Sequence, residues 1–580
     1  MQGNAVWVSE KSAIAVAAML CVIQLGSGFA WHRYPQTVFY NEFIPAACML
    51  LLGVLLAITG KVALRLSKET VAAVFIVALV LGEWSWLAFA NFATAVSLIS
   101  YVLFAVLCVC LVQWAVLRIG ISWVADCTAW GMLVCACLQC VASAFQLNGV
   151  SEPGLVMAKL MNAAYGNIAQ ENHFADLLWL GLVSVLHLWL RKSFPTVLAL
   201  IVVAAICFFS ALSVSRAVWL YTAAVPLVAL LYTRHLDVAE RRRVWIGAGT
   251  LFVLSVVSQM WLAFGGAQSA LGVTSAIDRV SEGGSNGQRM FDWMIAWKTA
   301  LAHPLTGVGP GMYSWQTALG SIGLPPVNYV RIGENAHNTI LHFAAEFGLV
   351  FIAIALGLIT LWLWRRWKEV PTLESLWGLG IIAVIGAHSL VEYPLWYAYF
   401  LVPFACAIGV IDAGDERLPT LRFNSRWLLI PVLLGAVILT STWRDYRKLE
   451  SAYKELNVTG MMDVETSARL DAVGASIGKA SLMAPQAAIL RMRVWRNNDL
   501  QRLPQIVRVC DESLKIKPQY NSFTACMTAY TLSGRKADAD QINEIVCGAF
   551  APIHSRPFME YAQKLYAARK WELPPKGRCL

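Results

Sequence analysis

Apolar residues in this chain form long unbroken runs, and short clusters of charged residues separate one run from the next. A helix needs about 20 apolar residues to cross a bilayer core about 30 Å thick. Runs close to that length predict thirteen membrane-spanning helices, at 12–30, 43–60, 70–90, 95–117, 121–147, 174–190, 196–212, 217–233, 244–263, 348–364, 375–391, 397–411 and 427–443. The pattern therefore predicts an all-α protein, a polytopic helix bundle in a membrane.

Composition strengthens this prediction and excludes a set of soluble domains. Hydrophobic residues make up 58% of the 580 residues and charged residues 14%, whereas an ordinary soluble domain has roughly 25% charged residues. Globular cores could not bury so much apolar surface, so much of it must face lipid. The net charge of +10 raises nucleic acid as a partner. However, the basic residues lie in short loops between the runs, where they orient helices in the bilayer, and no nucleic acid partner is expected.

The distribution of Lys and Arg predicts the orientation of the spans. With the N-terminus in the cytoplasm, the cytoplasmic loops hold most of the basic residues, and the opposite short loops hold only Arg33, Lys159 and Arg216. This asymmetry follows the positive-inside rule. The first run lacks a small-residue cleavage site, so we expect it to remain as a span. In a bacterial inner membrane, residues 264–347 and 444–580 would then face the periplasm.

The chain divides into two predicted domains. Residues 1–443 form a transmembrane domain that includes the loop 264–347, and residues 444–580 form a charged tail without a run long enough to span a membrane. Apolar residues at helical spacing in the tail predict short helices at 504–514, 520–532 and 537–549. The stretch from Glu512 to Ile542 resembles one tetratricopeptide repeat, and a generic helical hairpin is an equal alternative.

Ten of the fourteen cysteines lie in predicted spans, where a free Cys behaves as a small hydrophobe. The other four lie in the tail. In an oxidising compartment they permit two disulfides, and three pairings are open among Cys510, Cys526, Cys547 and Cys579. Their spacing matches no zinc pattern, so no metal is predicted there.

Polar residues at the non-cytoplasmic ends of the spans are the candidates for chemistry. The segment 333–349, "GENAHNTILHFAAEFGL", enters the tenth span and carries His337, Asn338 and Glu346. Ionisable residues that dip into a span are costly, and they usually face a protein-lined cavity. The structural alternative is a helix cap at Asn338 with interfacial His side chains, and these residues alone leave both interpretations open.

Two arginines lie in other segments on the same side. Arg216 lies in "ALSVSRAVWL" between the seventh and eighth spans, where its alternative role is to anchor a helix in lipid headgroups. Arg289 lies on an amphipathic helix in "SNGQRMFDWMIAWK", which precedes Gly307, Gly309 and Gly311. These glycines lack the strand and the Lys-Ser/Thr ending of a phosphate-binding loop. We therefore expect them to shape a tight turn.

Two further clusters are predicted at the same membrane face. The segment "HSLVEYPLWYAYFL" carries Glu392 and Tyr393 at the end of the eleventh span. An isolated Glu at that depth needs a partner, and a loop Arg is the candidate. The segment "GNIAQENHFADLL" carries Gln170, Asn172 and His173 at the start of the sixth span. A helix cap followed by an interfacial His is an equal alternative for this segment.

Together the clusters combine guanidinium groups with a His and carboxylates, and no CxxC, HExxH or acidic pair with metal spacing occurs on that face. Arg side chains bind phosphate oxygens through two parallel hydrogen bonds. A neutral His can accept a proton near pH 7. The residues therefore predict a site without metal or other cofactor that binds a phosphate-bearing lipid.

The order of the spans and the segments "ENAHNTILHFAAEFGL" and "ALSVSRAVW" resemble the O-antigen ligase and polymerase (WaaL/Wzy) superfamily of bacterial inner membranes. The segments "HSLVEYPLWYAYFL" and "GNIAQENHFADLL" and the tail are similar to general protein O-oligosaccharyltransferases of PglL type, which glycosylate pilins and other periplasmic proteins. The resemblance covers nearly the whole chain. It implies a helix bundle like that of the GT-C membrane glycosyltransferases.

The resemblance implies transfer of a preassembled glycan from undecaprenyl pyrophosphate to a Ser or Thr hydroxyl, without metal, nucleotide sugar or other cofactor. His337 matches the family's essential histidine, and Arg216 and Arg289 match its pyrophosphate-binding arginines. The expected partners are the lipid-linked glycan, a pilin-like acceptor protein and the bilayer. Supporting roles at the site are expected for Asn338, Glu346, Glu392, Tyr393, Asn172, His173 and Gln170.

Other functions remain open. The same motifs would serve an O-antigen ligase, whose acceptor is lipid A core, or a repeat-unit polymerase, whose acceptor is another glycan. A transporter of lipid-linked glycan predicts paired Gly- or Pro-broken helices in two corresponding halves of the chain, and the sequence shows no such pair. A membrane-anchored scaffold, in which the His and Arg residues are structural, is the remaining alternative.

Overall fold

The computed structural model describes residues 10–57, 61–65, 67–69, 71–72, 75, 92–159, 162–265, 268, 271–276, 284–325, 327–458 and 463–574. Helices dominate this part of the chain, as the sequence predicts. The named strands within it, β1 (Lys61–Arg65) and β2 (Thr420–Asn424), form one antiparallel pair in which Lys61 lies opposite Asn424. The all-α class is therefore confirmed.

Twelve of the predicted spans coincide with helices. They are α1 (Glu10–Leu25), α2 (Phe39–Ala57), α4 (Phe92–Ile119), α5 (Ile121–Leu147), α6 (Glu171–Leu190), α7 (Thr196–Leu212), α8 (Ala217–Tyr232), α9 (Val238–Phe264), α15 (Leu349–Trp367), α16 (Leu373–Ser389), α17 (Ala398–Gly414) and α18 (Arg426–Val458). The predicted span 70–90 lies largely outside the described residues. Among the described residues, seven helices are long and apolar enough to cross a membrane, and five apolar helices are shorter. The chain is a multi-pass membrane protein.

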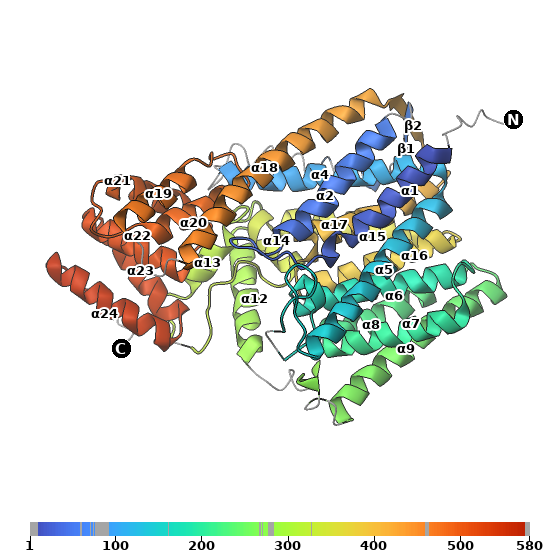
Figure 1. Ribbon diagram of the computed structural model, residues 1–580, viewed down its shortest axis with the longest axis horizontal. Helices are drawn as coiled ribbons and strands as arrows, with labels where there is room; N and C mark the ends of the chain where they lie inside the picture. The colour runs from blue at the N-terminus through green and yellow to red at the C-terminus, as the bar shows by residue number, and fades with distance from the viewer. Residues whose placement is uncertain are drawn as a thin grey trace. The chain divides into compact units, whose positions relative to one another are not determined.

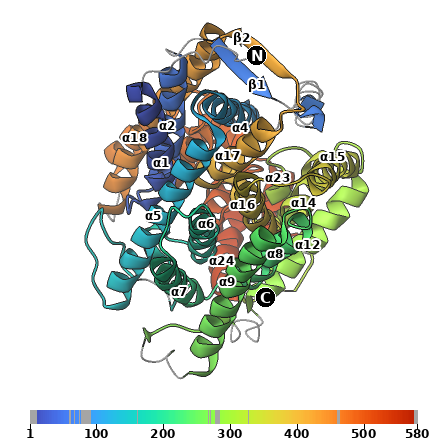
Figure 2. The ribbon, with the colours of Figure 1, turned by 90° about the vertical axis from the view of Figure 1, so that its right-hand side faces the viewer.

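The chain forms two compact units, and the first consists of Met1–Val77, Val102–Glu282 and Gly357–Leu439. In unit 1, α6 packs against α5, α7 and α16 (Figures 1 and 2). Nearly every side chain of α6 is buried. A small residue permits its close approach to α5, because a Cβ at Gly181 would lie only 2.4 Å from the Cβ of Ala136. Helix α6 is therefore the central helix of unit 1.

Unit 2 consists of Ala78–Tyr101, Gly283–Leu356 and Thr440–Leu580. Its helices besides the ends of α4, α15 and α18 are α12 (Gly284–Ala302), α13 (Tyr313–Gly320), α14 (Thr339–Phe347), α19 (Val464–Ala475), α20 (Ala484–Val494), α21 (Leu503–Ser513), α22 (Tyr520–Leu532), α23 (Lys536–Ala549) and α24 (Pro552–Ala568). Trp315 of α13 belongs to the same apolar core as Phe523 and Ile545 of the tail. The middle segment and the tail of unit 2 therefore share one core.

The tail agrees closely with its predicted helices, since α21, α22 and α23 match the three predicted ranges. Consecutive tail helices pack on one another from α19 to α24. A disulfide joins Cys510 of α21 to Cys526 of α22, which confirms one of the predicted bridges. Cys547 is also disulfide-bonded, and Cys579 lies outside the described residues. One detail differs: α18 continues without a break from Arg426 to Val458, so the chain is helical across position 444.

Candidate functional site

In unit 1, the first turn of α6 places two of the predicted site residues. Gln170 is the N-cap of α6, and its side-chain oxygen accepts a hydrogen bond from the backbone N–H of His173. Such a cap satisfies one of the amide groups that the first turn leaves without a helical partner. The sequence alternative of a helix cap in this segment is therefore correct for Gln170. The cap fixes the start of the helix that carries Asn172 and His173.

Asn172 joins three segments of unit 1. Its amide nitrogen donates to Oε1 of Glu392 at 3.0 Å, and its amide oxygen accepts from the hydroxyl of Ser215 at 2.7 Å. Ser215 precedes Arg216, which is the N-cap residue of α8. Glu392 is buried just after the end of α16. The buried Glu392 carboxylate thus has the Asn172 amide as a partner. The segment that carries Arg216 is hydrogen-bonded to the same amide through Ser215.

His173 belongs to an aromatic and polar cluster in the same unit. Its Nδ1 lies 2.8 Å from the hydroxyl of Tyr399. One turn further along α6, Asp176 lies 2.7 Å from Nδ1 of His388, and both side chains are fully buried. Tyr393 stacks on another tyrosine ring of the segment after α16. Asp176 and Tyr399 are not among the residues predicted from the sequence, although an acidic residue three positions after His173 within a span was a signal.

In unit 2, Glu346 holds the glycine-rich turn. Its Oε1 accepts from the backbone N–H of Gly311 at 2.8 Å and from that of Tyr313 at 3.3 Å. The backbone of α14 lies so close that a Cβ at Gly307 would be 2.2 Å from the carbonyl carbon of Glu346. Gly307, Gly309 and Gly311 all have positive φ angles, which favour glycine. The predicted tight turn is confirmed, and Glu346 stabilises it.

His337 lies in the loop that leads into α14. Its φ angle is +48°, in the left-handed region that residues other than glycine rarely adopt and that is found preferentially at functional sites. The next residue, Asn338, is the N-cap of α14, and its side-chain oxygen accepts from the backbone N–H of Leu341 at 2.9 Å. The cap interpretation is therefore correct for Asn338. The adjacent His337 side chain is half-buried rather than part of this cap.

Asp292 of α12 is a further candidate residue, which the predictions from the sequence do not include. It lies three positions after Arg289, so the two side chains share one face of the helix, and it is fully buried. Burial raises the pKa of its carboxyl to about 7, although the charges of His337 and Arg289 act in the opposite direction. The three residues are thus near enough to interact electrostatically. A carboxylate on the Arg289 face of an amphipathic helix was the signal in the sequence.

The structure therefore places the predicted residues in two groups. Arg289, His337 and Glu346 belong to unit 2, whereas Arg216 and Glu392 belong to unit 1. Asn338, which caps α14, is also in unit 2, and the other predicted unit 1 residues are Gln170, Asn172, His173 and Tyr393. In the described part of the chain, no group of three or more His, Cys, Asp and Glu side chains could hold a metal ion.

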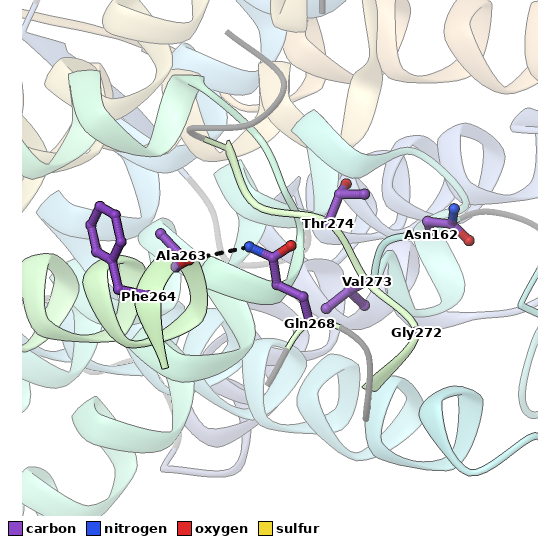
Figure 3. A pocket seen from close by; sticks show the side chains of 7 residues that line it. All are labelled: Asn162, Ala263, Phe264, Gln268, Gly272, Val273 and Thr274. Carbon is purple, nitrogen blue, oxygen red and sulfur yellow. Dashed lines mark hydrogen bonds between the residues drawn. The ribbon is translucent and has the colours of Figure 1, made fainter. Parts of the chain in front are cut away.

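A pocket of about 640 Å³ lies elsewhere in unit 1, beside the C-terminal end of α9 (Figure 3). Gln268 lies across it and donates from its amide nitrogen to the carbonyl oxygen of Ala263 at 3.4 Å. On the other side, the backbone N–H of Thr274 donates to the carbonyl oxygen of Asn162. None of the predicted site residues lines this pocket. Within unit 1, it is therefore distinct from the group of predicted residues.

Two family models match the chain. A model described as O-antigen ligase matches residues 200–356, and a model described as virulence factor membrane-bound polymerase, C-terminal, matches residues 376–558. Arg216, Arg289 and His337 all fall within the first match. Together, the two matches cover most of the residues between the start of α7 and the end of α24.

Two curated proteins of Acinetobacter baylyi are similar to this chain. A general O-oligosaccharyltransferase is 24% identical over 477 residues, which cover 76% of this chain and 78% of the relative. A ComP-specific O-oligosaccharyltransferase is 25% identical over 273 residues, which cover 46% of this chain and 47% of the relative.

Proposed function

This chain belongs to the O-antigen ligase and polymerase superfamily, on its protein O-oligosaccharyltransferase branch, and we propose that it transfers a preassembled glycan from undecaprenyl pyrophosphate to Ser or Thr hydroxyls of periplasmic proteins such as pilin. It is a multi-pass membrane glycosyltransferase that glycosylates protein. The donor is a lipid-linked glycan, and the site faces the periplasm of a bacterial inner membrane. The positive-inside asymmetry of the loops supports this orientation.

The donor needs little activation beyond neutralisation of its leaving group. When the bond between the anomeric carbon and the pyrophosphate oxygen breaks, the electron pair leaves with pyrophosphate, and negative charge grows on its oxygens. Guanidinium groups can hold these oxygens through paired, charge-assisted hydrogen bonds. Donors that are already in place stabilise such a developing charge without further reorganisation. We assign this role to Arg216 and Arg289.

The acceptor hydroxyl must lose its proton as its oxygen bonds to the anomeric carbon. We assign the general base to His337, whose ring nitrogen takes that proton and leaves an imidazolium ion. A neutral imidazole is suited to this step near pH 7. Attack from the face opposite pyrophosphate would invert the anomeric centre.

One observation carries this proposal. His337 has a strained backbone conformation, and it acts electrostatically on the same buried carboxyl as Arg289. Asn338 provides the cap of α14, so the cap itself does not account for the conformation of His337. A base placed beside a phosphate-binding arginine explains both features.

Reconstitution tests the proposal directly. The purified full-length protein is placed in vesicles with undecaprenyl-pyrophosphate-linked glycan, and either a pilin-like protein or lipid A core is supplied as acceptor. We expect glycan on Ser or Thr of the protein acceptor, and mass spectrometry of its peptides would detect it. Transfer to lipid A core alone would identify a ligase instead. Vesicles that move lipid-linked glycan across the bilayer without transfer would identify a transporter.

A further inference from the structure

Asp292 is buried in a way that the protein itself does not explain. Its side chain is fully buried, and neither carboxyl oxygen has a hydrogen-bond partner among the described residues. A buried carboxylate normally costs several kcal/mol unless hydrogen bonds or an ion pair compensate for the lost water. Proteins keep such unsatisfied groups mainly where a ligand or a reaction uses them.

The Asp292 carboxyl lies directly against the loop that precedes α14. The backbone of Gly333 passes directly over it, and a Cβ at that position would lie 2.6 Å from Oδ1 and 3.1 Å from Oδ2. The hydroxyl of Tyr313 lies nearby but donates to the backbone carbonyl of Asp292 at 2.7 Å, not to the carboxyl. The Asp292 carboxyl therefore packs against the backbone of the loop that carries His337, at a position where a residue larger than glycine would clash with it.

The charged groups that face Asp292 come from each neighbouring element. Arg289 lies on α12 itself, and His337 lies on the loop before α14. From α13, Tyr313 interacts electrostatically with both Asp292 and Glu346. On α14, Nε2 of His342 lies 3.5 Å from Oε2 of Glu346. Asp292 is thus a titratable carboxyl that interacts with two residues, Arg289 and His337, to which the proposed reaction gives a role.

We propose that the Asp292 carboxyl binds a substrate hydroxyl group at the transfer site and so receives from the substrate the hydrogen bond that the protein does not supply. The inference rests on the proposed function. A carboxylate repels the pyrophosphate oxygens that Arg289 attracts. Arg289 would therefore bind the pyrophosphate, and Asp292 would bind a hydroxyl group. The hydroxyl belongs either to the acceptor Ser or Thr or to a sugar of the donor, and the experiment below distinguishes these two sources.

The protonation of Asp292 gives the interaction a pH dependence. Burial raises the pKa of this carboxyl to about 7, against the charges of His337 and Arg289. The ionised form accepts a hydrogen bond more strongly than the neutral acid. Substrate binding should therefore improve as the pH rises through about 7.

The test compares Asp292→Asn and Asp292→Ala with the wild-type full-length protein in reconstituted vesicles. We expect KM for one substrate to rise about 10- to 100-fold, the loss of one hydrogen bond to a charged group. A rise confined to the acceptor places the hydroxyl on Ser or Thr, and a rise confined to the donor places it on a sugar. Lys298→Gln, an exposed change on the same helix, is the matched control and should leave both values unchanged.

Stability and pH separate this role from a structural one. Replacement of an unsatisfied buried carboxyl by a neutral side chain should leave Tm equal or higher, and Asp292→Asn should abolish the change in KM near pH 7. A lower Tm with proportionate loss of folded enzyme, or KM values within twofold of wild type for both substrates, would overturn the inference. The assay uses whichever hydroxyl acceptor the wild type glycosylates, so a wrong acceptor rejects the proposed function and still leaves the result on Asp292 decisive.

Discussion

Two buried aspartates, one in each unit, differ in whether the protein supplies a hydrogen-bond partner for the carboxyl group. Asp176 in unit 1 and Asp292 in unit 2 are both fully buried. Asp176 lies 2.7 Å from Nδ1 of His388, whereas both carboxyl oxygens of Asp292 lack a hydrogen-bond partner among the described residues. Burial alone therefore does not tell whether a carboxyl has a partner within the protein.

The difference extends to the neighbours of each aspartate. In unit 1, Asn172 forms hydrogen bonds across helices with Ser215 and Glu392. In unit 2, the side chains of Tyr313 and Glu346 form hydrogen bonds with backbone groups. We infer that the unit 1 network orders the segment that carries Arg216, while unit 2 leaves the Asp292 carboxyl without a hydrogen-bond partner among the described residues.

The largest effect is expected for His337. His337→Ala removes the proposed base, and turnover should fall by about 10²- to 10⁴-fold, while donor binding and Tm stay near wild type. Initial rates of transfer, donor binding in vesicles and thermal unfolding would measure the three quantities. His554→Ala, the same change at an exposed position of the tail, is the control. A folded His337→Ala protein with near-normal transfer would remove the base assignment, and an equal loss of Tm would make the residue structural.

Substitutions of Arg216 and Arg289 should impair transfer in a different manner from His337→Ala. Arg289→Ala removes charge that both the bound donor and the transition state use, so donor affinity and turnover should fall together. Arg289→Lys keeps the charge but loses the planar fork, and it should recover only part of the activity. Arg216→Ala and Arg216→Lys should follow the same order. Full activity of both Lys variants would show that charge suffices and that paired hydrogen bonds to pyrophosphate are not made.

Removal of His388, the partner of Asp176, should lower the stability of the protein rather than its catalytic activity. His388→Ala leaves Asp176 buried without its partner, and loss of one member of a buried pair costs about 3–5 kcal/mol. Thermal unfolding in detergent should show this loss, whereas Asp292→Asn should show none. The double variant Asp176→Leu/His388→Leu removes both polar groups and should be more stable than His388→Ala. If His388→Ala unfolded at the wild-type temperature, the pair would contribute nothing, and the contrast between the two aspartates would fail.

The sequence predicts the spans well because apolar runs are a local property, and it indicates His337 and Arg289 as candidates because their segments resemble known ones. It does not reveal that Asp176 and His388, which are 212 positions apart, form a pair. Such contacts depend on which helix faces pack together, and a hydrophobic pattern does not encode that choice.

Other features of the structure could not be predicted from the sequence, for related reasons. The sequence did not indicate that α18 continues to Val458, because the predicted domain boundary at 443/444 rests on a change from apolar to charged residues and no Gly or Pro marks the helix there. The role of Glu346 depends on the backbone of a turn about 35 positions earlier in the chain. Asp292 looks like an ordinary polar position of an amphipathic helix, and only its burial and its missing partners set it apart.

The pH dependence of stability sharpens the contrast for Asp292. Its pKa rises from 3.8 to about 7 on folding, which corresponds to at most about 4 kcal/mol. Because the folded pKa is the higher one, this contribution is fully present below pH 4 and is lost as the pH rises to about 7. The stability of the wild type relative to Asp292→Asn should therefore decline between pH 4 and pH 8. Unfolding of both proteins across this range would measure it, and a constant difference would contradict the raised pKa.

The smallest expected effect concerns Asn338, which lies beside His337 but has a structural contact. Asn338→Ala removes the hydrogen bond to the N–H of Leu341, and loss of an N-cap typically costs about 1 kcal/mol. Asn338→Asp keeps the cap. Thr372 caps α16 in unit 1 through the N–H of Ser375, so Thr372→Ala is a matched loss of a cap in the other unit.

The two cap variants should lose similar stability but differ in activity. Asn338 fixes the end of the loop that holds His337 in its left-handed conformation, so Asn338→Ala should lower turnover severalfold with little change in donor affinity. Thr372→Ala should leave turnover unchanged, because no part of the proposed reaction depends on the start of α16. Asn338→Asp should restore both stability and turnover. If instead folded Asn338→Ala lost more than about 100-fold in turnover, a loss far beyond one cap, Asn338 would contact substrate itself. The division between a base at 337 and a cap at 338 would then be wrong.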